Sequence, residues 1–193
     1  MPKVVDAAQR RSEITDAASR LIARAGIEAA TMREVAAEAG WTTGAVMHYF
    51  ADKRELLLTT FQESLSRRRS RRPPGATTSP AERLRASLEG ALPVDEERRR
   101  HWLVTLACCL QASGDAKLAA AQRDAYREFR DHVAAMVLES GGAPDGEQVA
   151  TAERLIALAD GIAVQALFDP AGWPPRRQLA ALDTALGEDR VHF

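Results

Sequence analysis

The sequence predicts an all-α protein of about nine helices, for three reasons. Apolar residues recur at spacings of three and four positions along most of the 193-residue chain, which is the period of an amphipathic helix. Glycine and proline interrupt these segments at intervals of about one helix length. No run of alternating apolar and polar residues is long enough to indicate a strand, and no internal repeat is present.

The N-terminal fifty residues carry the start and stop signals of short helices. A first helix with one apolar stripe ends at Gly26. Thr31 and Glu34 form a capping-box pattern ahead of a short helix that ends at Gly40. A second short helix is expected from about Thr42 to Tyr49. The stripe of the first helix consists of Ile14, Ala17, Ala18, Leu21, Ile22 and Ala25.

The remaining helices follow a break in composition. Asp52 caps a longer helix, after which residues 67–80 read RRRSRRPPGATTSP and indicate a loop. Ser79, Pro80 and Glu82 then supply the cap, the first-turn proline and the acidic third residue of a new helix. Four further helices are expected at about 95–113, 115–140, 146–168 and 175–187.

Composition narrows the class of protein. The chain has 46% hydrophobic residues, no uncharged apolar run long enough to cross a membrane, and no apolar signal-peptide block, so we expect a cytoplasmic location. Cys108 and Cys109 are adjacent, and no Cys/His spacing indicates a metal, so we expect no metal and no cofactor. We interpret the two cysteines as small packing residues, with a redox-sensing thiol as the alternative.

Charge is distributed unevenly along the chain. Residues 1–72 carry 13 Lys and Arg against 9 Asp and Glu, whereas residues 73–193 carry 13 against 18. Because residues 1–72 are basic and residues 73–193 are acidic, we expect the N-terminal part to be the one that contacts phosphate groups.

The segment from Thr31 to Phe50, TMREVAAEAGWTTGAVMHYF, fits a helix-turn-helix. Ala36 is small where the two helices would cross, and Gly40 stands where the turn needs a left-handed backbone. This geometry presents the second helix to a DNA major groove. The residues at its start are small enough for close approach to DNA. They are Thr42, Thr43, Gly44 and Ala45.

With this motif, and with ADKREL after it, residues 10–60 resemble the TetR family of regulators. The resemblance implies a DNA-binding domain over residues 1–53 and a helical ligand-binding and dimerisation domain over residues 54–193. It also implies that Thr31 and Lys53 contact phosphate; for Thr31 a role as a helix cap alone is equally open. The predicted DNA-binding set is Thr31, Thr42, Thr43, Gly44, Ala45, Met47, His48, Tyr49 and Lys53.

Some residues depart from the family pattern or admit a second reading. Met47 stands where the family often has tyrosine, and a methionine can touch a thymine methyl group. We interpret Trp41 as a bulky core residue, with contact to DNA or a partner as the alternative. The Arg67–Arg72 run is expected to be a solvated charge run beside a loop. Arg10 and Arg11, together with Lys3, are candidates for an N-terminal arm near the phosphates.

The C-terminal helices have apolar faces that would build a core with a cavity between helices. By the resemblance, such a cavity takes a small, mostly apolar effector, although each lining residue can equally be packed core. The candidate ligand-binding residues are Trp102, Leu106, Cys109, Tyr126, Phe129 and Met136.

Residues 153–169 are apolar on nearly every side, more than one buried stripe requires. We therefore expect a homodimer that forms through this helix and the next, as in the TetR family. The C-terminal stretch also resembles that of choline- or betaine-type repressors. Asp160 in this apolar run needs a partner. The predicted interface residues are Leu158, Gly161, Ile162, Gln165, Leu179, Leu182 and Leu186.

The resulting expectation is a non-enzymatic repressor that a small molecule releases from a palindromic DNA operator. An activator, or a regulator without a ligand, remains the alternative within the same fold. An enzyme is disfavoured because no nucleophile–base pair, metal spacing or phosphate loop is present. An interaction scaffold would leave the ordered motif unexplained.

Overall fold

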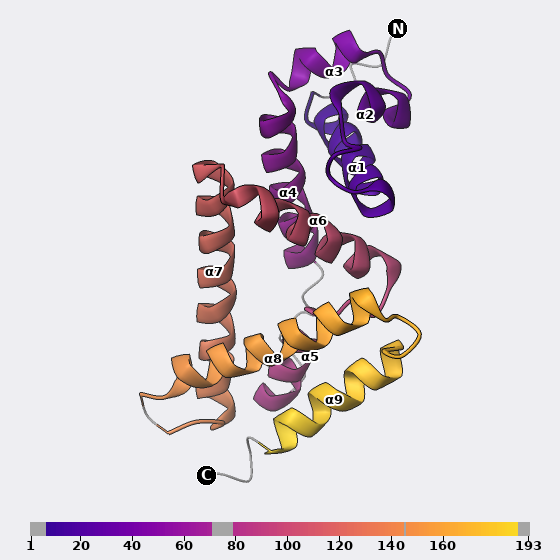
Figure 1. Cartoon of the computed structure of the whole chain (residues 1–193). Helices are drawn as coiled ribbons and strands as arrows, with labels where there is room; N and C mark the ends of the chain where they lie inside the picture. The colour runs from indigo at the N-terminus through magenta and orange to yellow at the C-terminus, as the bar shows by residue number, and fades with distance from the viewer. Residues whose placement is uncertain (1–6, 71–78, 145, 189–193) are drawn as a thin grey trace, which may run out of the picture. The chain divides into compact units, whose positions relative to one another are not determined.

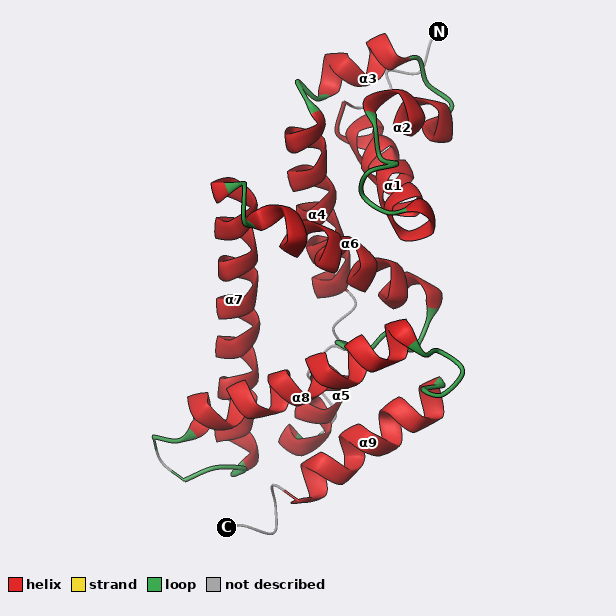
Figure 2. Cartoon of the chain, in the orientation of Figure 1, coloured by secondary structure: helices red, strands yellow, loops and turns green. Residues whose placement is uncertain are grey.

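A computed structural model describes residues 7–70, 79–144 and 146–188, and in these ranges the chain is helical with no strand, as predicted (Figures 1 and 2). The helices are α1 (Ala7–Ala25), α2 (Met32–Ala39), α3 (Thr43–Tyr49), α4 (Lys53–Ser70), α5 (Pro80–Glu89), α6 (Glu96–Ala112), α7 (Ala116–Ser140), α8 (Gln148–Phe168) and α9 (Pro175–Glu188). The expected helix ends agree with these bounds to within a few residues.

Side-chain caps explain where several helices begin. The Asp52 carboxylate accepts from the Glu55 backbone N–H at 2.8 Å, as predicted for the start of α4. At α5 the capping box is complete, because Ser79 accepts from the Glu82 N–H while the Glu82 carboxylate accepts from the Ser79 N–H. At α2 the Thr31 hydroxyl accepts from the Glu34 N–H at 3.2 Å, but the Glu34 side chain pairs with Arg33 instead.

The backbone forms two compact units. The first comprises residues 1–67 and 100–122, and the second comprises residues 68–99 and 123–193. The first unit therefore takes in the helix-turn-helix, most of α4 and most of α6, which is more of the chain than the predicted DNA-binding domain. The domain boundary at residue 53 remains a prediction.

The first unit has an apolar core and a charged hub. Ile14, Phe50 and Phe61 are fully buried in it. The hub is the Asp16 carboxylate, which pairs with three arginines from three helices. These are Arg20 of α1, Arg67 of α4 at 2.6 Å and Arg100 of α6 at 3.4 Å.

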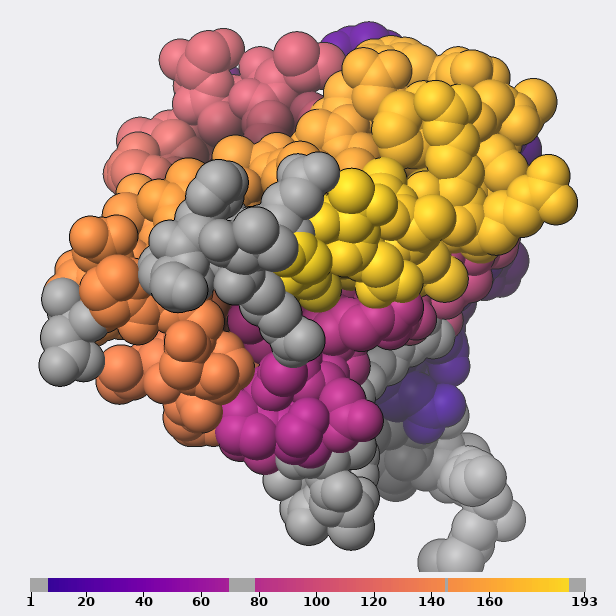
Figure 3. Space-filling model, turned by 90° about the horizontal axis from the view of Figure 1, so that it is seen from below, coloured from indigo at the N-terminus to yellow at the C-terminus, as the bar shows by residue number. Residues whose placement is uncertain are grey.

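The second unit is built around an apolar core from α5, α7, α8 and α9. Helices α8 and α9 pack against each other as an antiparallel pair, and α9 also contacts α5 (Figures 1 and 3). The core residues are Leu84, Leu88, Ala91, Leu92, Phe129, Val133, Ala134, Val137, Ala152, Leu155, Ile156, Ala159, Ile162 and Leu182.

The arginine run at the end of α4 corrects one expectation. Arg67 pairs with Asp16, the guanidinium of Arg68 lies 4.3 Å from the centre of the Phe129 ring, and Arg69 pairs with Glu128. The expectation of a solvated run is therefore wrong for Arg67 and Arg68, which are half-buried against partners in their own units, whereas Arg69 and its partner Glu128 are exposed. Residues 71 and 72 lie outside the described residues.

Candidate nucleic-acid interface

The helix-turn-helix has the backbone that the sequence predicts. Gly40 follows α2 in the left-handed conformation, with φ 73° and ψ 27°. The Trp41 backbone N–H then donates to the Ala36 carbonyl at 2.8 Å, which closes the end of α2. Helix α3 begins after Thr42, whose hydroxyl accepts from the Ala45 N–H at 3.2 Å. Thr42 thus has a structural role in addition to any contact with DNA.

Burial divides α3 into an inner and an outer face. Val46 is fully buried against the core, beside Val35 and Ala36 of α2. The exposed members of the predicted DNA-binding set are Thr31, Thr42, Gly44, Met47 and His48, and the half-buried members are Thr43, Ala45, Tyr49 and Lys53. Helix α3 therefore presents an open surface supported by a buried valine.

Two arginines of α1 hold the end of α3. Arg11 donates to the Tyr49 carbonyl and lies 4.4 Å from the centre of the Phe50 ring, and its other nitrogen pairs with Glu55 at 3.3 Å. Arg10 lies 5.2 Å from the centre of the half-buried Trp41 ring. These contacts give both arginines a structural role, so an arm toward phosphate remains a prediction. Lys3 lies outside the described residues.

The carboxylate of Glu55 completes this cluster. It accepts from the Ala51 backbone N–H at 2.8 Å, and this bond, followed by the bond from Arg11, lowers the pKa of Glu55. The ionised side chain thus links the start of α4 to α1 and keeps the turn after α3 in place.

Lys53 lies at the start of α4 but is already engaged. Its Nζ donates to the Ile27 carbonyl at 2.8 Å and lies 3.9 Å from the Glu28 carboxylate. The side chain therefore ties α4 to the loop between α1 and α2. It would have to exchange these partners to contact a phosphate.

Sequence reasoning overlooked two exposed cations. Arg33 lies in the first turn of α2, its side chain is 82% exposed, and it pairs with the adjacent Glu34. Arg54 follows Lys53 and is exposed. Both belong to the motif segments TMREV and ADKREL, and their place in the first turn of a helix was the signal that could have identified them.

The candidate ligand-binding residues divide between the two units. Trp102, Leu106 and Cys109 belong to the first unit; Trp102 is buried, Leu106 is half-buried and Cys109 is exposed. The candidates in the second unit are the buried Phe129, the half-buried Met136 and the exposed Tyr126.

A pocket of about 460 Å³ lies between α7 and α8 in the second unit. Tyr126 and Asp160 line it, and the Tyr126 hydroxyl donates to the Asp160 carboxylate at 2.6 Å. Asp160 therefore has the partner that its apolar surroundings require. Burial raises the pKa of Asp160, while the bond from Tyr126 and the charge of Arg68 act in the opposite direction.

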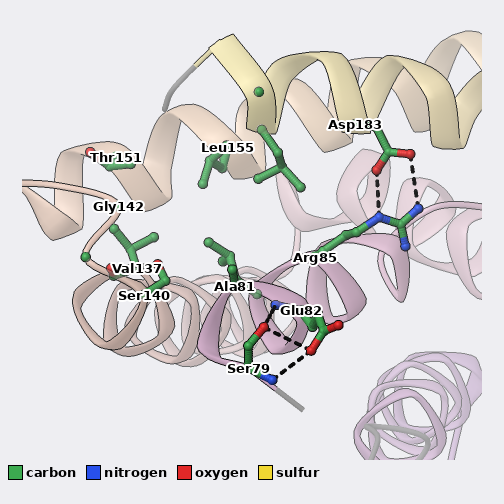
Figure 4. A pocket seen from close by; sticks show the side chains of 14 residues that line it. Ser79, Ala81, Glu82, Arg85, Val137, Ser140, Gly142, Thr151, Leu155 and Asp183 are labelled. Carbon is green, nitrogen blue, oxygen red and sulfur yellow. Dashed lines mark hydrogen bonds and ion pairs between the residues drawn. The ribbon is translucent and has the colours of Figure 1, made fainter. Parts of the chain in front are cut away.

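A second pocket of about 650 Å³ lies among α5, α7, α8 and α9, and none of the candidate ligand residues lines it (Figure 4). Its floor is apolar, with Leu84, Val137 and Leu155. At its edge Arg85 forms two bonds with Asp183, the shorter of them 2.6 Å. Among its polar lining residues, Arg85 and Asp183 are paired with each other, and Ser79 and Glu82 are bonded to each other in the capping box.

The predicted dimer residues differ in burial. Leu158, Gly161 and Gln165 are exposed on α8, and Leu179 and Leu186 are half-buried on α9. Ile162 and Leu182 are 6% and 0% exposed and belong to the core of the second unit. Phe168, which belongs to the apolar run 153–169 that predicts the interface, is 80% exposed at the end of α8.

Several alternatives can be examined in the described residues. Burial raises the pKa of the Cys108 thiol to about 12, which disfavours a reactive thiolate there, whereas Cys109 is exposed. No group of three potential metal ligands is found in the described part of the chain. None of the described helices is both long and apolar enough to cross a membrane.

A capped α2, a left-handed glycine turn and an exposed α3 on a buried support define a helix-turn-helix DNA-binding protein. Residues 14–60 match the model for bacterial regulatory proteins of the tetR family, and residues 80–188 match the C-terminal model for BetI-type transcriptional repressors. The chain belongs to the TetR family of transcriptional regulators.

Individual relatives support this assignment over most of the chain. The regulator PksA of Bacillus subtilis is 31% identical, covering 88% of this chain and 84% of its own. BetI of Burkholderia ambifaria is 31% identical, covering 84% of each. A Rhodococcus sp. Rha1 transcriptional regulator superposes with a TM-score of 0.83 at 30% identity, over 92% of this chain and 94% of its own. A Saccharomonospora viridis protein in complex with choline superposes with a TM-score of 0.84 at 24% identity, over 92% and 95%.

Proposed function

We propose that this regulator is a cytoplasmic homodimeric repressor that binds a palindromic operator and is released by a small molecule. The observation that carries the proposal is the outer face of α3, where Gly44, Met47 and His48 are exposed while Val46 is buried beneath them. A recognition helix needs this division, because one face must hold it to the domain while the other enters the major groove.

The phosphate contacts would come from the rim of this face. Thr31, Arg33 and Arg54 are exposed at the starts of α2 and α4, and Lys53 would join them after leaving the Ile27 carbonyl. The predicted base and backbone contacts of Thr42, Thr43, Ala45 and Tyr49 remain part of the proposal.

The dimer would form through the exposed side of α8 with help from α9. Leu158, Gly161 and Phe168 give α8 an apolar exposed stripe, and Gln165 lies on the same side. A two-fold axis through such a stripe would bring the two recognition helices to successive major grooves, about 34–36 Å apart. Ile162 and Leu182 would support the interface from within the protomer.

The effector would bind among the C-terminal helices, in the pocket between α7 and α8 that Tyr126 lines. The half-buried carboxylate of Asp160, bonded to Tyr126, would pair with the charged group of a small organic cation. Three arginines also line this pocket; Arg127 pairs with Asp124 and Arg130 pairs with Asp131, and the third is Arg123. Choline is the first molecule to test, since a structural relative holds it. Trp102, Leu106, Cys109, Phe129 and Met136 remain candidate liners.

The direct test measures binding of the full-length protein to 30–40-base-pair duplexes that tile the DNA upstream of its own gene, by fluorescence anisotropy at several salt concentrations. We expect nanomolar binding to one palindromic duplex and weaker, salt-sensitive binding to the others. Equal, weak binding to every duplex would contradict the proposal. A reporter placed behind the operator then separates repression from the alternative, activation.

The effector step has its own experiment. Choline is titrated into the protein–operator complex and into the free protein, with wild type compared with Asp160→Asn and Tyr126→Phe. Release of the duplex by wild type at a choline concentration that leaves Asp160→Asn bound would support this site. If choline binds neither protein, choline is excluded as the effector while operator binding still stands.

A further inference from the structure

The outer face of α3 carries one large apolar side chain. Gly44, Met47 and His48 are spaced three and four positions apart, so they share one side of the helix. Met47 is 57% exposed, and it is the one exposed large hydrophobic residue in the described parts of α1 to α4. Its position on the outer face of the recognition helix, beside Gly44 and His48, places it where such a helix meets the major groove.

Gly44 supports the same conclusion from the neighbouring position. A Cβ atom placed on Gly44 would meet no heavy atom within 4 Å, and the residue has no left-handed backbone. Nothing inside the protein therefore requires a glycine at this place, although glycine is among the residues least favourable to a helix. The missing side chain lowers the surface beside Met47 and lets an external surface approach closely.

The chemistry of methionine narrows what that surface can be. A thioether has no hydrogen-bond donor and is a weak acceptor, so it cannot read the polar edges of bases. The major groove offers one apolar group on its base edges, the C5 methyl of thymine. We infer that Met47 reads a thymine through this methyl group, once in each operator half-site. The inference rests on the proposed function and adds to it the identity of one base.

His48 contributes to the same surface in a different way. Its ring packs edge-on to the Tyr49 ring, with centres 5.2 Å apart, which fixes its direction next to Met47. A histidine ring can donate or accept at a base edge, so it complements the apolar contact of Met47. The half-site then needs a polar base edge next to the thymine.

The test begins with selection of bound duplexes from a pool with a 30-base-pair random core, using full-length wild type. Each thymine of the enriched duplex is then replaced by deoxyuridine, which pairs identically and lacks only the methyl group. Wild type should lose about fourfold in affinity at one symmetry-related thymine per half-site, the loss expected for one methyl group that is no longer buried. Other thymines should show little change.

Three variants link this effect to Met47. Met47→Ala should bind the thymine and deoxyuridine duplexes equally, because it has no side chain to reach the methyl. Met47→Leu should keep the discrimination, since it keeps an apolar side chain of similar reach. Leu110→Ala, which removes a 76% exposed leucine of α6, is the matched control and should behave as wild type. Circular dichroism checks that each variant is folded.

The outcomes separate this inference from the function on which it rests. If no duplex is enriched, operator binding itself is wrong. If a duplex is enriched but deoxyuridine weakens wild type at no position, or weakens Met47→Ala as much as wild type, DNA binding stands and thymine reading by Met47 is overturned.

Discussion

Three of the described helices carry a glycine on an exposed face, and the surroundings of two of these glycines, in α3 and α8, differ; the third, Gly187, lies near the end of α9. Gly44 in α3 and Gly161 in α8 each have open space where a Cβ would stand, and neither has a left-handed backbone. Around Gly44 the exposed neighbours are Met47 and His48, whereas around Gly161 they are Leu158 and Gln165. Packing within the protomer requires neither glycine, so it is the exposed residues around each one, and not the glycine alone, that point to an external partner.

The difference between the two faces indicates which partner each one meets. The face of α3 is small and mixed in polarity, with cations at its rim, and suits a nucleic acid. The face of α8 continues to Phe168 and is mainly apolar, which suits a second copy of the same helix. Gly40 offers a third case, because its φ of 73° makes glycine a requirement of the fold itself.

The largest effect is expected at α8. Gly161→Arg would place a charge in the proposed interface, where an unpaired buried charge is strongly unfavourable. The open space around Gly161 lets the protomer fold. We expect dimer dissociation to rise by at least about 100-fold, since a few kcal/mol are lost, with operator binding falling in parallel. Analytical ultracentrifugation measures the first effect and anisotropy the second.

A matched control tests whether position matters more than the added charge. Gly114→Arg adds the same side chain at an exposed turn after α6 and should leave the dimer intact. A Gly161→Arg protein that remains dimeric at nanomolar concentration would show that α8 does not form the interface.

The next effect concerns the turn between α2 and α3. Gly40→Val forces a β-branched residue into the left-handed region, which costs about 1–2 kcal/mol of unfolding free energy or more. Denaturant unfolding measures the loss. Gly40 has free space around it, so strain in the backbone is the whole cause. Equal stability of Gly40→Val and wild type would mean that the left-handed turn is not retained in solution.

Gly44→Ala is expected to act in the opposite direction on stability. An alanine in α3 should raise the free energy of unfolding by about 0.5–1 kcal/mol, because the helix no longer contains glycine and the new methyl meets no atom of the chain. Operator affinity should fall at the same time, since the methyl occupies the space for DNA. A stabilised variant with unchanged affinity would remove Gly44 from the DNA-binding surface.

These comparisons also show which parts of the molecule the sequence could predict. The helix ends and the turn at Gly40 depend on residues a few positions apart, such as Ser79 with Glu82, and local patterns were sufficient for them. Two partners of Asp16, Arg67 and Arg100, lie 51 and 84 positions away in the chain, so no local pattern identifies them. For the same reason the sequence did not reveal that Lys53 donates to the Ile27 carbonyl.

The packing of the C-terminal helices was harder to predict than that of the helix-turn-helix. The apolar run of α8 predicted a helix with more than one packing face, but the run could not say which side faces the core. Ile162 proved to be buried in the protomer, while Leu158 and Phe168 are exposed. The direction of a side chain on an almost uniformly apolar helix is decided by its neighbours in space, here α5, α7 and α9, and their positions were not known from the sequence.

A smaller effect is expected at the rim of the DNA-binding face. Arg33→Ala removes an exposed cation that pairs with the adjacent Glu34, so stability should change little. If each protomer contacts one phosphate through Arg33, the slope of log affinity against log salt should decrease by about 1.8 for the dimer. Lys53→Ala should lower both slope and stability, because it also loses the bond to Ile27. An unchanged slope for Arg33→Ala would exclude that contact.

The smallest effect concerns the ion pairs that hold α2 to α1. Bonds from Arg24, then from Arg20, lower the pKa of the half-buried Glu38 below its ordinary value of 4.5. A lowered folded-state pKa contributes stability that is present above the unfolded value and is lost as the pH falls through the folded value. Glu38→Gln should therefore be less stable than wild type at pH 7, and the difference should shrink below about pH 4.5. Unfolding free energies measured from pH 7 to pH 3 check this, and Arg24→Gln should show the same convergence because it removes the first partner. A difference between wild type and Glu38→Gln that stays constant over this range would show that packing, and not ionisation of Glu38, links α2 to α1.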